Sequence, residues 1–216
     1  MFNSTEMDIV KLNGEVVFEK SPYEEFDYIE SNSAQYIDTG IYPNNGTMTI
    51  TLKVSINYAP NGYRGLCGAR NAQTVSSQSA CIWVYGSYLR LDWLGINNIL
   101  FDYTPGATYT IELSDDKVTI NDEVFTNSNS NILPLEYTFL IGNINDNGAE
   151  SSLGGANMSI YYCKIEQENL VLAEFVPAKL TRNVVNGTIG EVGLWDKVTN
   201  TFFGNQGTGA FEAYSL

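Results

Sequence analysis

Apolar and polar residues alternate without a break from residue 47 to residue 56, and this pattern constrains the fold more than any other feature of the chain. Alternation with a period of two is typical of a strand that is buried on one side only. The apolar residues that share one face are Met48, Ile50, Leu52, Val54 and Ile56. Similar short segments, separated by turn residues such as Gly86-Ser87, continue to residue 175. Because no amphipathic helix pattern interrupts them, the sequence predicts an all-β chain with an antiparallel β-sandwich fold.

The first residues of the chain predict a hairpin that is separate from this sandwich. Two short apolar runs flank Asn13-Gly14, and an Asn-Gly pair in this position is a strong signal for a two-residue hairpin turn. A polar segment with Ser21-Pro22 follows and is typical of a linker. We therefore expect an N-terminal arm, residues 1–21, that anchors or oligomerises the protein, and a sandwich domain, residues 22–216.

The charge of the chain limits its partners. The sequence has 25 acidic and 11 basic residues and a net charge of −14. A field of this sign repels phosphate backbones and anionic headgroups, so we expect no nucleic acid and no membrane among the partners. No segment approaches the roughly 18 apolar residues of a membrane span. The N-terminus lacks the basic and apolar regions of a signal peptide, so we expect a protein that is made in the cytoplasm.

Two residue types limit the chemistry. The sequence contains no histidine, which excludes Ser-His-Asp and Cys-His catalysis and imidazole ligands for a metal. Cys67, Cys81 and Cys163 are widely spaced and odd in number, so they predict buried thiols and neither a disulfide framework nor a metal site. Carboxylate chemistry and the binding of hard cations by oxygen atoms remain open.

Several strings in the main body resemble the motifs of one domain family. They are Tyr28 to Gly40 at the opening, Gly68-Ala69-Arg70-Asn71 in the middle, and Phe175-Val176-Pro177-Ala178, Val192 to Phe203 and Gly207 to Gly209 towards the end. In this order they resemble the concanavalin A-like (laminin-G-like) jelly-roll domains of phage and prophage virion proteins and of gut bacterial surface proteins. The resemblance covers about Phe26 to Phe211 and implies a jelly roll that binds sugars, makes oligomeric contacts or decorates virions.

Glu25, Asp27 and Glu30 fit the Glu-x-Asp-x-x-Glu pattern of concanavalin A-like glycoside hydrolases. In those enzymes a bulged strand places the three carboxylates on one face as nucleophile, orienting residue and acid/base. Here the pattern lies at the front of the domain, before the strands that would form a cleft around it. Together with the missing histidine, this position leads us to expect that the chain is not an enzyme.

An aromatic group with neighbouring charged residues is the best candidate for contact with a glycan, because rings stack on sugar faces and planar polar groups bind the hydroxyls. Its members are Tyr63, Arg64, Trp83, Tyr85, Tyr88, Arg90, Asp92 and Trp93. Alternation places Trp83 with Tyr85 on one face and Trp93 with Leu91 on one face, so some of these rings must belong to the core.

One loop resembles the start of a calcium-binding loop. Oxygen-bearing side chains precede Gly148 at Asn143, Asn145, Asp146 and Asn147. The bidentate Glu that such a loop requires is absent, since Gly154 occupies its place. A solvated connection between strands is the alternative, and apart from Ca²⁺ the sequence predicts no cofactor.

Three functions follow from these patterns. The first is a bacteriophage virion protein, such as a head or tail fibre, spike or decoration module. It would assemble as a homo-oligomer, with a trimer favoured, bind other virion proteins through the arm, and attach to host-surface glycans. The second is a carbohydrate-binding module of a bacterial surface protein, and the third is a glycoside hydrolase that uses Glu25 and Glu30.

Overall fold

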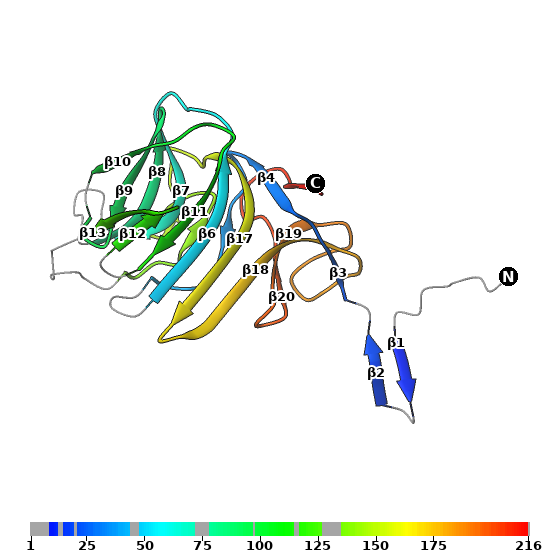
Figure 1. The fold of residues 1–216 in the computed structure, drawn as a ribbon. Helices are drawn as coiled ribbons and strands as arrows, with labels where there is room; N and C mark the ends of the chain where they lie inside the picture. Colours follow the sequence, from blue (N-terminus) through cyan, green and yellow to red (C-terminus); the bar gives the residue numbers. More distant parts are fainter. Residues whose placement is uncertain are drawn as a thin grey trace.

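Two large β-sheets pack face to face as a sandwich in the computed structural model (Figure 1). The structure describes residues 9–12, 15–19, 21–43, 48–71, 78–96, 98–114, 117–126 and 135–215. Nearly all strand pairs in these residues are antiparallel and none of these residues is α-helical, which confirms the predicted all-β sandwich. In these ranges there is likewise no helix with the length and apolar character that crossing a membrane would take.

The larger sheet is built around the long strands of the chain. In spatial order it contains β13 (Glu123–Thr126), β12 (Lys117–Ile120), β11 (Thr108–Leu113), β6 (Met48–Ile56), β17 (Asn157–Gln167), β18 (Leu170–Leu180), β19 (Val192–Asp196) and β20 (Thr201–Phe203). Three short strands join it at the side: β3 (Tyr23–Glu25) pairs with β18, and β4 (Tyr28–Asn32) pairs with β17 and with β21 (Glu212–Tyr214).

The smaller sheet contains the segments that carry most of the predicted ligand contacts. Its strands, in spatial order, are β10 (Ile99–Asp102), β9 (Tyr88–Trp93), β8 (Ser79–Tyr85), β7 (Tyr63–Arg70), β14 (Leu140–Ile141) and β5 (Ile37–Asp38). A small hairpin of β15 (Asn145–Asp146) and β16 (Ala149–Glu150) attaches to β7 through a parallel pairing. The predicted turn at Gly86-Ser87 is confirmed, because Tyr85 pairs directly with Tyr88 across it.

The core lies between the two sheets and follows the predicted alternation. Met48 is 4 % exposed, and the other four residues predicted on that face of β6 are completely buried. Ile82 and Val84 of β8 and Leu91 of β9 face them from the smaller sheet. Burying each such side chain contributes about 1.5–3 kcal/mol to folding, which makes this layer the main source of stability. Thr47, the first residue of the predicted strand, lies outside the described residues.

The three cysteines are free thiols with no exposed surface, as predicted. Burial raises the pKa of each thiol above its ordinary value. Because the thiolate is the reactive form, Cys67, Cys81 and Cys163 act here as small apolar core residues.

The opening and closing strings of the family resemblance meet in space. The Gln35 side chain donates to the carbonyl of Thr208 at 3.0 Å, and the amide of Tyr36 donates to Oδ1 of Asn205 at 3.1 Å. A Cβ at Gly207 would lie 1.9 Å from the carbonyl oxygen of Ala34, so only glycine fits there. The two ends of the sandwich therefore meet here, and packing accounts for the glycine at position 207.

The predicted N-terminal hairpin is present as β1 (Ile9–Leu12) and β2 (Glu15–Glu19), which pair with each other and lie apart from the sandwich (Figure 1). The turn predicted at Asn13-Gly14 lies outside the described residues, as do residues 1–8 and 20. The role of residues 1–21 as an arm stays a prediction.

Candidate functional site

Six of the eight residues predicted to contact a glycan lie on the outer face of the smaller sheet. We call this set the aromatic platform, and its members are Tyr63, Trp83, Tyr85, Tyr88, Arg90 and Asp92. The residues that alternate with them on β8 and β9, among them Ile82 and Leu91, point into the core. Side chains alternate between the two faces of each strand. Three adjacent strands therefore bring together residues from as far apart in the sequence as Tyr63 and Asp92.

A row of three tyrosines crosses the platform. Tyr63 pairs with Tyr85 on β8, and Tyr85 pairs with Tyr88 on β9. The rings of Tyr63 and Tyr85 are stacked, with centroids 4.4 Å apart. Tyr85 is 43 % exposed and Tyr88 is 37 % exposed, so two rings of the row are open to a ligand.

Arg90 and Asp92 form a fixed polar pair beside this row. The guanidinium of Arg90 contacts the Asp92 carboxylate at 3.0 Å and donates to the Tyr63 hydroxyl at 3.1 Å. Asp92 also accepts a hydrogen bond from the amide of Asn98 at 3.0 Å. Burial alone would lower the pKa of Arg90, but its bonds to Tyr63 and Asp92 raise that pKa above its ordinary value. The Arg90 guanidinium therefore stays charged, and both side chains are held in place.

Trp83 lies on the same face as the rest of the platform but is only 3 % exposed, because neighbouring side chains cover it. The ring of Tyr63 meets it edge-on, with centroids 6.3 Å apart, and the guanidinium of Arg70 lies 4.8 Å from its centroid. Arg70 is held in turn by two hydrogen bonds to Asp146, at 2.9 and 2.6 Å. Trp83 is therefore a buried support, and its predicted direct contact with a glycan is corrected.

The prediction that Trp93 contacts a ligand is wrong. Trp93 is 2 % exposed, packs edge-on against Phe139 in the core, and donates from its indole nitrogen to the carbonyl of Ser114 at 2.6 Å. It follows Asp92 in the strand, so alternation turns it to the opposite face. Arg64 pairs with Val84, which points into the core, so it does not share the face of Tyr63. Its guanidinium donates to the carbonyls of Tyr63 and Leu153 at 2.9 and 2.8 Å.

The residues predicted to bind calcium form a tight hairpin turn. Asn147 and Gly148 have φ angles of 57° and 89° between β15 and β16, the conformation in which an Asn-Gly pair closes a two-residue hairpin. The Asp146 carboxylate binds Arg70, and the side-chain oxygens of Asn143 and Asn145 accept hydrogen bonds from the amides of Ile144 and Gly148. The described ranges contain no group of three or more His, Cys, Asp or Glu that could hold a metal ion. Calcium binding at this turn stays a prediction.

The carboxylates of the hydrolase pattern do not share one bulged strand. Glu25 lies on β3 and contacts the ammonium of Lys197 at 3.0 Å, whereas Glu30 lies on β4 and accepts from the hydroxyl of Ser159 at 3.2 Å. Asp27 lies between the two strands, where its amide donates to the carbonyl of Tyr214 at 3.0 Å. The local structure that the pattern requires is therefore not formed.

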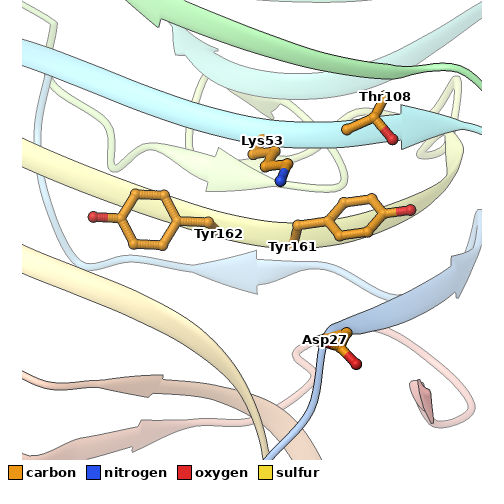
Figure 2. Close-up of a pocket in the computed structure, with 5 residues that line it drawn as sticks. All are labelled: Asp27, Lys53, Thr108, Tyr161 and Tyr162. Atoms are coloured by element: carbon orange, nitrogen blue, oxygen red, sulfur yellow. The ribbon is translucent and has the colours of Figure 1, made fainter. Parts of the chain in front are cut away.

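A second candidate surface, on the outer face of the larger sheet, was not predicted from the sequence. It is a hollow of about 540 Å³ lined by Asp27, Lys53, Thr108, Tyr161 and Tyr162, and we call it the tyrosine hollow. Figure 2 shows the two tyrosine rings extending in opposite directions along β17, with Lys53 above and between them and Asp27 below.

A β-bulge places both tyrosines of the hollow on the same face. Ile160 of β17 pairs with Val54 of β6 and Tyr162 pairs with Lys53, so Tyr161 is an extra residue in the ladder. The sequence does carry a signal for this bulge. The buried residues Ile160 and Cys163 are three positions apart, where uninterrupted alternation would put them two apart.

No family model matches the chain, and no curated protein matches it. Among solved structures it is similar to a family 7 alginate lyase, A1-II′, in complex with substrate, with 20 % identity and a TM-score of 0.40 over 62 % of this chain and 66 % of the lyase chain. It is also similar to a sialidase of Trypanosoma rangeli in complex with 2,3-difluorosialic acid, with 11 % identity and a TM-score of 0.42 over 77 % of this chain and 34 % of the sialidase chain. The chain thus spans less than two thirds of the length of either structure.

Both matched structures are carbohydrate-active enzymes. This finding overturns the expectation that the chain is not an enzyme, which the missing histidine and the position of Glu25 suggested. At these identities the likeness concerns the fold alone, so no catalytic residue of either enzyme is assigned to this chain.

Proposed function

We propose that this protein binds carbohydrate through the aromatic platform. The observation that carries the proposal is the pair of exposed rings, Tyr85 and Tyr88, beside a guanidinium and a carboxylate that are already held in place. Stacked aromatic rings offer a flat apolar surface to the C–H face of a sugar. The Arg90 guanidinium and the Asp92 carboxylate, held together at 3.0 Å, supply a donor and an acceptor for hydroxyl groups on the same face as these rings.

Contacts among its own members make the platform suited to binding. Tyr63 is fixed by its stacking on Tyr85, by Arg90 and by its edge-on contact with the buried Trp83. Side chains that are already ordered lose little conformational freedom when a ligand arrives, so more of the contact energy remains for affinity.

The test is binding to a glycan array by the full chain and by the Tyr85→Ala/Tyr88→Ala double variant. We expect the double variant to lose about tenfold or more in affinity for every glycan that the full chain binds, which corresponds to about 1.4 kcal/mol. The matched control is Tyr42→Ala, since Tyr42 is also an exposed tyrosine, at 50 %, and lies outside the platform. Equal binding by the double variant and the control, or no glycan bound by the full chain, contradicts the proposal.

A role in assembly is a second proposal, supported by one observation. Among the described strands, β1 and β2 pair only with each other, and a two-stranded hairpin alone is at best marginally stable in water. Docking of this hairpin on another protein or on further copies of the chain would supply the missing contacts. The finer prediction of a phage fibre or spike rests on the sequence resemblance, since neither matched structure is a virion protein.

A further inference from the structure

The tyrosine hollow lies on the side of the sandwich away from the aromatic platform. Lys53 and Thr108 are exposed on the outer face of the larger sheet, while Leu52 and Val54, which flank Lys53, are buried against the smaller sheet. The platform belongs to the outer face of the smaller sheet. The two surfaces therefore share no residue and are separated by the full thickness of the core.

The positive charge in the hollow is not used by the fold. Among the residues that the structure describes, Lys53 has no carboxylate partner, and its ammonium lies 5.5 Å from the centroid of the Tyr161 ring. Other lysines on this face are paired: Lys117 contacts Glu112 at 3.4 Å and Lys164 contacts Glu166 at 2.7 Å. In a chain with 25 acidic and 11 basic residues, a lysine left beside aromatic rings is available as a donor to a ligand.

A wall of further tyrosines holds the Tyr161 ring in place. Tyr28 lies 5.1 Å from Tyr161 between centroids, and Tyr214 stacks on Tyr28 at 5.0 Å. The hydroxyl of Tyr214 donates to Glu212 at 2.6 Å, which raises the pKa of Tyr214 to about 12 and fixes the end of this wall. The ring that lines the hollow is thus ordered before any ligand binds.

The composition of the lining favours a ligand with hydroxyl groups and no net charge. Tyr161 and Tyr162 offer ring surface, Lys53 a donor, Asp27 an acceptor and Thr108 a group that can do both. The volume of about 540 Å³ is within the range of small-molecule sites, roughly 300–1,000 Å³. The net charge of −14 opposes the approach of an anion.

We infer that the tyrosine hollow is a second sugar site, specific for uncharged saccharides and independent of the aromatic platform. The sugar ring stacks on Tyr161, the Lys53 ammonium and the Thr108 hydroxyl bind its hydroxyls, and Tyr162 closes the other side. This site rests on other residues than the proposed function, so either can fail while the other holds.

The test uses the full chain with the Tyr85→Ala/Tyr88→Ala substitutions, so that the platform makes no contribution. The isotope-labelled protein is titrated with lactose, maltose, cellobiose, mannobiose and digalacturonate while amide NMR shifts are followed. We expect at least one uncharged disaccharide to shift the amides of Lys53, Tyr161 and Tyr162 in a saturable way. Digalacturonate is expected to bind more weakly than that disaccharide.

Two substitutions and a control establish where the sugar binds. Tyr161→Ala and Lys53→Met should each weaken binding about tenfold, and Lys53→Met, at an exposed position, remains informative if Tyr161→Ala lowers stability. Lys117→Met removes a paired lysine from the same face and should leave affinity unchanged. The inference is overturned if no uncharged disaccharide shifts these amides, if both substitutions leave affinity unchanged, or if digalacturonate binds more tightly.

Discussion

The carboxylate of Asp196 shows how one buried acid organises a connection between strands. Asp196 is 1 % exposed, at the point where β19 ends. It accepts hydrogen bonds from the amides of Glu174 and Val198 at 2.8 and 3.0 Å and from the hydroxyl of Thr199 at 2.5 Å. The carboxylate therefore satisfies donors from both β18 and the turn that leads into β20.

Replacing Asp196 by alanine should destabilise the protein by about 3 kcal/mol, because several buried donors lose their acceptor together. The measurement is chemical denaturation followed by tryptophan fluorescence. Asp122→Ala serves as the control, since Asp122 lies exposed in the turn between β12 and β13. This substitution should lower the free energy of unfolding by less than about 0.5 kcal/mol. Equal stability of the two variants would show that the Asp196 hydrogen bonds have no net effect.

At the scale of elements, the bulge in β17 determines which side chains lie on the outer face of the larger sheet. A regular strand would present one tyrosine where the bulged strand presents Tyr161 and Tyr162. Pairing continues on both sides of the extra residue, from Met158 with Ile56 to Gln167 with Met48. The bulge therefore adds a ring to the surface without changing which residues enter the core.

Deleting Tyr161 should convert this segment into a regular ladder and leave the fold intact. Ile160 and Tyr162 then alternate normally opposite Val54 and Lys53, so we expect a loss of only about 1 kcal/mol, mainly from the ring packed on Tyr28. Circular dichroism and the midpoint of thermal unfolding check this. A variant that does not fold would mean that the bulge also sets the curvature of the sheet.

Alternation predicted the strands and their buried faces, but it could not predict which side of the sandwich a face belongs to. Leu91 and Trp93 were correctly placed on one side of their strand. Only the packing of the two sheets reveals that this side is the core, which removes Trp93 from the site. The bulge at Tyr161 escaped prediction because its signal is a single changed spacing. The side-chain oxygen atoms around Asn147-Gly148 were interpreted as calcium ligands. The positive φ angles of this pair explain the residue types better, because they are those of a tight hairpin turn.

For the whole molecule, the hairpin of β1 and β2 lies apart from the sandwich, whose first strand begins at Tyr23 (Figure 1). Removing residues 1–21 therefore leaves every strand of the two large sheets in place.

If the hairpin assembles the protein, the full chain should be an oligomer and the chain without residues 1–21 a monomer with an unchanged unfolding midpoint. Light scattering coupled to size exclusion measures both masses. A monomer in both cases would contradict the assembly role, and an oligomer in both would assign the contact to the sandwich.

The pairing of β4 with β21 also determines when the protein can fold. Tyr28 pairs with Tyr214 and Glu30 with Glu212, so a strand near the start of the sandwich has its partner almost at the end of the sequence. Contacts between such distant segments require a large loop to close first, which slows folding. During synthesis β4 must wait with an unpaired edge until residue 214 has left the ribosome. The sandwich is therefore expected to complete its folding only after residue 214 has emerged, in one slow cooperative step.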